Sequence, residues 1–182
     1  MNQDSLVNEG VGANYGVELT LERFFNDGYY YLFTTSLFNS RYEGSDGIER
    51  NTAYNTRYVV NALAGREWAL KSGKFLSVNL KATTIGGPYL TPLDYELSQA
   101  RGRAVYHESK AFSVREDAYF RIDLRLSFRQ EFSRSTLEAS LDLQNLTNNK
   151  NIFSQSYIPR TNSVVTLYQQ SFFPVPYVRF TF

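Results

Sequence analysis

The residues able to do acid, base or nucleophilic chemistry are few in this sequence. The only histidine is His107, and Glu108 and Ser109 follow it directly. Adjacent side chains of an extended chain point in opposite directions, so such a run pairs no nucleophile with a base unless a special turn intervenes. We therefore expect His107 to be a surface histidine, and we expect no catalytic residues and no enzyme activity.

Metal, phosphate and nucleic-acid chemistry have little support. The chain has no cysteine, which excludes disulfides, thiolate metal sites and a cysteine nucleophile. The carboxylates show no metal-ligand spacing, and there is no Gly-rich phosphate loop. With 19 basic and 18 acidic residues the net charge is +1, which gives no electrostatic basis for general nucleic-acid binding. We expect no metal, no cofactor and no nucleic-acid partner.

Charged side chains occupy five of the six odd-numbered positions from 121 to 131. They are Arg121, Asp123, Arg125, Arg129 and Glu131. Because alternate residues of a strand share a face, this set forms one ionic face. It could line a substrate path, facing the lumen of a barrel, or it could be a solvated wall whose charges pair across strands. The second interpretation is favoured, because Glu138 and Asp142 offer opposite charges nearby.

A second set of polar and aromatic residues lies in the longest connection, residues 87 to 117. Its candidate ligand contacts are Tyr89, Asp94, Tyr95, Arg101, Arg103 and Tyr106. Long loops often carry binding residues. The same mixture is also the ordinary composition of an exposed loop, so both interpretations stay open.

Alternation of apolar and polar residues dominates the elements that must position these sets. It is clearest in residues 119 to 132, where Phe120, Ile122, Leu124, Leu126 and Phe128 alternate with polar residues. Period two predicts strands with one apolar and one polar face. The same pattern marks residues 15 to 22, 75 to 84, 137 to 145 and the terminal 172 to 182, and strand-like composition marks 29 to 41 and 57 to 69.

The seven predicted strands are long, about 10 to 14 residues, whereas globular strands have about 5 to 6 and tilted membrane strands about 9 to 11. Their connections alternate in length. Short turns are predicted at 26 to 28, 71 to 74 and 133 to 135, and long polar loops at 42 to 55, 87 to 117 and 147 to 171. Segregation of loops by length is typical of an outer-membrane barrel. We therefore expect an all-β, antiparallel, up-and-down transmembrane β-barrel, of which these strands form part.

Several short motifs resemble the end of a TonB-dependent outer-membrane receptor. They are RYVVNALAG at 57 to 65, GGPYLTPLD at 86 to 94, YFRIDLRLSF at 119 to 128, LDLQNLTN at 141 to 148 and FPVPYVRFTF at the terminus. Asn145 and Asn148 match the family's Asn-Leu-X-Asn position, and the likeness covers about residues 14 to 182.

This resemblance implies a larger barrel with an N-terminal plug, in which residues 1 to 182 are the C-terminal segment. Residues 1 to 13 lack the basic start and apolar stretch of a signal peptide, and no plug is recognised. The implied partners are outer-membrane lipid of a Gram-negative cell, the remaining strands and plug, and the TonB system. Val178, Phe180 and Phe182 resemble the signal read by the barrel-insertion machinery.

The resemblance implies uptake of a scarce nutrient such as an iron chelate, a vitamin or a glycan. The residues also allow a different class of protein: a self-contained β-barrel or sandwich that binds a surface or polysaccharide in the cell envelope. Solubility separates the two, because a self-contained domain stays monomeric without detergent and a barrel segment aggregates.

Overall fold

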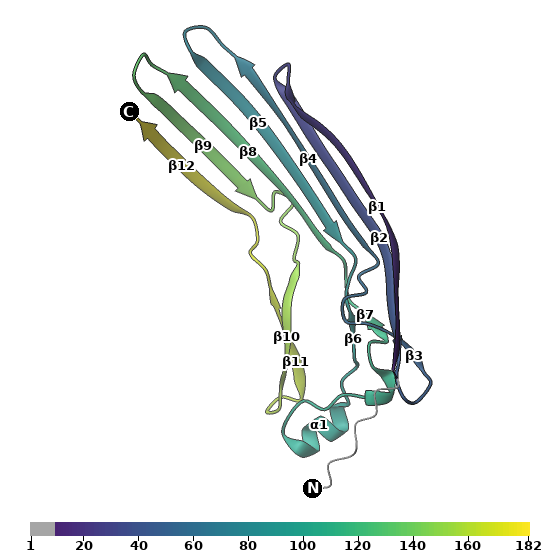
Figure 1. Ribbon diagram of the computed structural model, residues 1–182. Helices are drawn as coiled ribbons and strands as arrows, with labels where there is room; N and C mark the ends of the chain where they lie inside the picture. Colours follow the sequence, from purple (N-terminus) through teal and green to yellow (C-terminus); the bar gives the residue numbers. More distant parts are fainter. Residues whose placement is uncertain (1–9) are drawn as a thin grey trace.

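The computed structural model describes residues 10–182 and shows an all-β chain (Figure 1). Its main sheet is antiparallel, and each strand pairs with the next long strand in sequence, which confirms the seven predicted strands. Their bounds are β1 Val11–Asn26, β2 Tyr29–Glu43, β4 Tyr58–Ala69, β5 Lys74–Ile85, β8 Tyr119–Glu131, β9 Thr136–Gln144 and β12 Phe173–Thr181. The predicted polar start falls mostly on residues 1–9, which lie outside the described residues.

The short turns lie at one end of the sheet and the long loops at the other, as predicted (Figure 1). The loops hold elements that the polar composition did not indicate. These are β3 Glu49–Asn51, β6 Tyr89–Leu90, α1 Tyr95–Arg101, the 3-10 turn η1 Glu108–Lys110, β7 Val114–Arg115, β10 Ile152–Ile158 and β11 Ser163–Tyr168. The β10–β11 hairpin extends beyond the ends of β9 and β12 (Figure 1). No helix among residues 10–182 is long and apolar enough to cross a membrane.

Two of the short turns use residues that tolerate positive φ. Asp27 and Gly28 have φ of 53° and 80°, and Ser72 and Gly73 have φ of 63° and 67°. The first pair makes up the whole two-residue turn between β1 and β2, where positive φ at both positions matches the twist of the strands; the second pair ends the four-residue connection between β4 and β5. A side chain at Gly28 would also collide with the carbonyl oxygen of Glu67 on the next hairpin. These turns therefore hold consecutive long strands directly side by side.

The strand register joins alternate side chains of all seven strands into two common faces. Leu80, for example, lies opposite Ala64 on β4 and Leu124 on β8. The next residue of β5, Lys81, lies opposite Leu63 and Asp123 on the other face. The apolar face carries Val17, Leu19, Leu21, Phe33, Leu37, Val60, Ala62, Ala64, Leu76, Val78, Leu80, Ala82, Ile122, Leu124, Leu126, Leu137, Ala139, Leu141, Leu143, Val178 and Phe180.

The apolar face has no cover within residues 10–182. No hydrophobic side chain there is buried, and Val17, Leu21 and Val178 are 72%, 52% and 70% exposed. The chain exposes 13121 Å², whereas a compact protein of its mass exposes about 9,000 Å². A soluble domain is built from at least two packed layers, and the main sheet is a single curved layer (Figure 1). The described chain therefore lacks the dry interior of a sandwich.

The sheet curves without closing in the part of the chain that the structure describes. β1 pairs only with β2, and β12 pairs only with β9. Each outer strand thus presents a row of unused backbone donors and acceptors, which in natural proteins is paired or covered.

Candidate functional site

The ionic residues predicted from the alternation of β8 are paired with one another or with neighbouring strands. Arg125 makes two hydrogen bonds to Asp142 on β9, the Nη2–Oδ2 bond being 2.6 Å long. Arg121 Nε lies 2.6 Å from Asp123 Oδ1, and Arg121 Nη2 donates to Gln144 Oε1 at 3.1 Å. The charges of Arg121 and Arg125, in the middle of the polar face, are therefore each paired with a carboxylate.

The remaining charges near the turn end are also paired, with one exchange of partner. Arg129 contacts Glu67 at 3.2 Å and Glu131 at 3.1 Å. Glu138 lies opposite Arg129 in the register but pairs with Arg179 on β12, at 2.9 Å. The predicted wall of cross-strand ion pairs is thus present. Such partly exposed pairs contribute about 0 to 1 kcal/mol each, and they leave each charged side chain of β8 with a partner of opposite charge.

A hollow of about 340 Å³ lies on the polar face, where Tyr30 and Asn79 meet the ionic residues. Tyr30 donates a 2.7 Å hydrogen bond to Asn79 Oδ1. Gly65 lies between these two on β4, and a side chain there would collide with both. The hollow thus lies on the polar face, and the apolar face is on its reverse.

A larger cavity, of about 1200 Å³, lies among the long loops. Ile85 and Tyr119, which end the polar face of β5 and β8, form its floor. The cavity therefore continues the polar side of the sheet. Its aromatic lining comes from three separate segments and consists of Tyr95, Tyr106, Phe112, Tyr119, Phe153 and Tyr157.

The charged lining of the loop cavity is mostly acidic. Glu108, Glu116 and Asp117 contribute carboxylates, and Lys150 is the one cation of the lining. Burial, followed by the charge of Asp117, raises the pKa of the Glu116 carboxyl above its ordinary value. Both effects disfavour negative charge. The cavity is thus suited to neutral or cationic groups with apolar surface.

The six loop residues predicted as ligand contacts do not lie together. Tyr95 and Tyr106 line the cavity, but Tyr89 faces away from it. Asp94 caps α1 by accepting a 2.9 Å hydrogen bond from Leu97 N. Its second oxygen lies 3.5 Å from Nδ1 of the partly exposed His107.

Arg101 and Arg103 are exposed at and just after the end of α1, and neither makes an ion pair with a described residue. Sequence reasoning missed Phe153 and Tyr157. No local signal links them to residue 106, because the β10–β11 hairpin decides where they lie.

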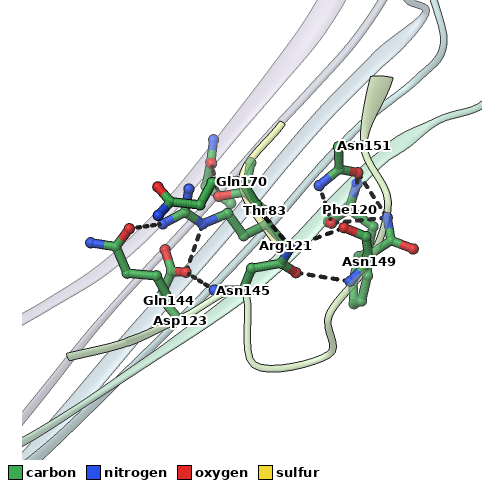
Figure 2. A network of polar contacts seen from close by, with 10 residues as sticks. Thr83, Phe120, Arg121, Asp123, Gln144, Asn145, Asn149, Asn151 and Gln170 are labelled. Carbon is green, nitrogen blue, oxygen red and sulfur yellow. Dashed lines mark hydrogen bonds and ion pairs between the residues drawn. The ribbon is translucent and has the colours of Figure 1, made fainter. Parts of the chain in front are cut away.

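Asparagines fasten the loops to the end of the sheet (Figure 2). Asn145 is 1% exposed and has a φ of 49°. Its Nδ2 donates to the carbonyl oxygens of Asn149 and Gln170 at 2.9 and 3.1 Å, and its Oδ1 accepts from Asn149 N at 3.0 Å. Its own N–H donates to Asp123 Oδ1 at 2.8 Å. One buried side chain therefore joins β9 to the segments before and after the β10–β11 hairpin.

Asn151 extends this arrangement along β8. Its amide accepts from Phe120 N at 2.9 Å and donates to Phe120 O at 2.8 Å, as a neighbouring strand would. Asn149 Nδ2 donates to Asn151 Oδ1 at 2.7 Å. Figure 2 shows both amides gathered at Phe120. They bind the backbone N–H and carbonyl oxygen of Phe120 at a place along β8 where β9 has already ended. Asn151 also lines the loop cavity, so these bonds hold one of its walls in place.

A second buried asparagine holds the connection between β2 and β4. Asn55 is fully buried, and its Oδ1 accepts a 3.0 Å hydrogen bond from Ser40 N. Its Nδ2 donates to Asn39 Oδ1 and Asn51 Oδ1 at 2.9 and 2.8 Å. This contact places the β3 segment beside the end of β2.

At the tip of the same connection, the ion pair between Asp46 and Arg50 leads us to predict a response to pH. Arg50 Nη2 lies 2.6 Å from Asp46 Oδ2, and Ile48 N donates to Asp46 Oδ1 at 3.2 Å. These hydrogen bonds lower the pKa of Asp46 from 3.8 to about 2. Because the pKa of Asp46 is lowered by folding, the ionised carboxylate stabilises the folded tip at pH values above the ordinary pKa. This contribution to stability is lost as the pH falls through about 2.

An NMR titration of the Asp46 carboxyl checks this. In Arg50→Gln the pKa should rise toward its ordinary value, because the first and largest cause is removed. An unchanged midpoint in that variant would contradict the assignment.

The apolar face carries aromatic residues toward both ends. Near the turns they are Tyr29, Tyr31, Trp68, Phe128 and Phe180, and near the loops they are Tyr15, Tyr58 and Phe120. Arg23 and Arg66 lie on this face too, with guanidinium carbons 4.1 and 5.2 Å from the ring centroids of Tyr29 and Trp68. Leu, Ile, Val and Ala dominate between the two aromatic bands.

Within residues 10–182, no group of three histidine, aspartate or glutamate side chains is placed to hold a metal ion. No protein-family model, curated protein or solved structure matches the chain.

Proposed function

We propose that this chain forms part of the wall and the extracellular loops of an outer-membrane β-barrel, a TonB-dependent receptor that takes up a scarce nutrient such as an iron chelate, a vitamin or a glycan. The observation that carries the barrel proposal is the continuous apolar face across seven strands, exposed in a chain whose described residues bury no hydrophobic side chain. A hydrocarbon environment covers such a face without a second protein layer.

The two aromatic bands support the same assignment. Membrane barrels carry an apolar band about 25 Å tall, flanked by aromatic girdles at both interfaces. Arg23 and Arg66 are compatible with this surface, because long cationic side chains reach from an apolar region toward the interface. Their positions over Tyr29 and Trp68 put both charges at the girdle nearest the short turns.

The polar face and the loops support a receptor role. Paired charges such as Arg125 and Asp142 suit a water-filled lumen. The loop cavity opens at the end of that face, where an incoming ligand would arrive before entering the lumen. The free edges of β1 and β12 suit pairing with further barrel strands. The TonB-linked family itself is supported by the motif resemblance of residues 57 to 65, 86 to 94 and 141 to 148.

Spin labels at neighbouring positions of β8 test the barrel proposal. The chain is incorporated into phosphatidylcholine bilayers with a nitroxide at position 124 or at position 125. The Leu124 label should be accessible to dissolved oxygen and shielded from a water-soluble nickel complex, and the Arg125 label should show the reverse. The same contrast is expected between positions 80 and 81 of β5, which share these faces. Equal accessibility at both parities would overturn the proposal.

A further inference from the structure

Two guanidinium groups share one tyrosine ring at the loop end of the sheet. The guanidinium carbon of Arg57 lies 5.8 Å from the ring centroid of Tyr89, and that of Arg115 lies 5.9 Å from the same centroid. Arg115 also lies 6.0 Å from the ring of Tyr58. We call these four residues the rim cluster.

The rim cluster lies on the apolar side of the sheet and away from the loop cavity. In the β6–β7 hairpin, Leu90 pairs with Val114 and both line the cavity. Tyr89 pairs with Arg115, and neither lines it. Since successive side chains of a strand point to opposite faces, these two point the other way. Tyr58 lies opposite Leu37 and so belongs to the apolar face.

The two positive charges of the rim cluster are not neutralised by the described residues. Neither Arg57 nor Arg115 has a carboxylate oxygen within 4.0 Å in that part of the chain, which distinguishes them from the paired arginines of β8. Arg115 donates to the carbonyl oxygens of Gly87 and Thr56 at 3.3 and 3.2 Å. Arg57 donates no side-chain hydrogen bond there, and its buried Nε has no partner.

Arg57 is also held in an unusual backbone conformation. Its φ is 71°, a region that bulky residues rarely adopt. Its carbonyl oxygen accepts a 2.9 Å hydrogen bond from Phe38 N, which ties it to the end of β2. Strain of this kind persists where the surrounding structure imposes it, and it clusters at functional sites.

We propose that the rim cluster binds the phosphate group of a membrane lipid. The inference rests on the proposed function, because it places the cluster at the boundary between the hydrocarbon and the lipid headgroups. Guanidinium groups bind phosphate through paired N–H donors, and tyrosine is suited to that boundary because one end of its side chain is apolar and the other wet. A lipid is the expected occupant because the rim cluster adjoins the apolar face: Tyr58 belongs to both.

Lipid selectivity measured by electron spin resonance tests the proposal. The chain is incorporated into phosphatidylcholine bilayers that contain a trace of spin-labelled phosphatidic acid or spin-labelled phosphatidylcholine. The protein should restrict the phosphatidic acid label more strongly. Arg57→Gln should lower its relative association constant about tenfold, equivalent to about 1.4 kcal/mol. This variant removes a charge without removing a side-chain hydrogen bond to a described residue. The β6–β7 hairpin and the start of β4 should therefore keep their fold.

The matched control is the double variant Arg101→Gln with Arg103→Gln, which removes two exposed arginines outside the rim cluster. It should leave the selectivity unchanged. Equal restriction of both lipids by the unmodified chain, or an equal loss in the control, would overturn the lipid site while leaving the barrel proposal intact. Displacement of the phosphatidic acid label by inorganic phosphate would overturn the lipid as occupant in favour of a free anion. Failure of the chain to restrict either lipid would instead count against the barrel itself.

Discussion

Replacing Leu126 with arginine should reduce the free energy of folding into a bilayer by about 2 to 4 kcal/mol, the cost of an arginine on the lipid face near the bilayer centre. Leu126 lies in the middle of β8, opposite Val78 and Leu141. It is 39% exposed and has apolar neighbours on both sides. The loss should therefore exceed that of the same substitution near either end of the strand, because the cost falls toward the membrane interfaces.

The measurement is urea-dependent folding into phosphatidylcholine vesicles. Trp68 is the only tryptophan and lies on the apolar face, so its fluorescence reports insertion directly. The matched control is Ser127→Arg, one position along the same strand. Ser127 lies opposite Ser77 and Ser140 on the polar face, so the control should cost far less. Equal losses in the two variants would contradict the assignment of the faces.

Replacing Asn145 with alanine should destabilise the loop end of the sheet by about 3 kcal/mol. The substitution removes two donated hydrogen bonds and one accepted bond from a side chain that is 1% exposed. Each buried group left without a partner costs about 1 to 3 kcal/mol. The left-handed backbone at this position adds a further penalty for alanine, because asparagine tolerates positive φ better.

Two further variants separate these causes. Asn145→Gly relieves the backbone penalty and keeps the loss of hydrogen bonds, so it should recover only part of the stability. Asn162→Ala is the comparison variant: Asn162 has a φ of 46° but is only partly buried at the tip of the β10–β11 hairpin, where its Oδ1 accepts a 2.7 Å hydrogen bond from Tyr157, so its replacement should cost less than that of the buried Asn145. Urea unfolding gives the free energies, and hydrogen exchange of the Asn149 amide reports its hydrogen bond to Asn145 Oδ1. Unaltered exchange in Asn145→Ala would contradict the role assigned to its side chain.

Much of the fold follows from local patterns. Leu76, Val78 and Leu80 share a face because successive residues of any strand point to opposite sides, and this holds before the neighbouring strands are known. Asp27 and Gly28 predict a turn because both tolerate positive φ. The pairing of Arg125 with Asp142 was also accessible, since adjacent antiparallel strands joined by a short turn have a restricted register.

The roles of residues in the long loops could not be predicted from local sequence patterns in this way. Asp94 was expected as a possible ligand contact, but it caps α1, a role that depends on whether the helix forms there. Tyr89 and Tyr95 were predicted as one set, and the β6–β7 hairpin separates them. Composition could not distinguish these outcomes, because tyrosine and aspartate serve equally well in an exposed loop and in a structured one.

The sequence by itself determined the seven strands, the short turns and the separation of an apolar from a polar face, because each depends on the geometry of a few consecutive residues. Only the tertiary structure decided that Tyr106, Phe153 and Tyr157 line one cavity, and that Arg57 and Arg115 meet at Tyr89. These contacts join residues far apart in the chain. Their geometry is set by how β10–β11 and β6–β7 dock at the end of the sheet, and no local periodicity encodes that docking.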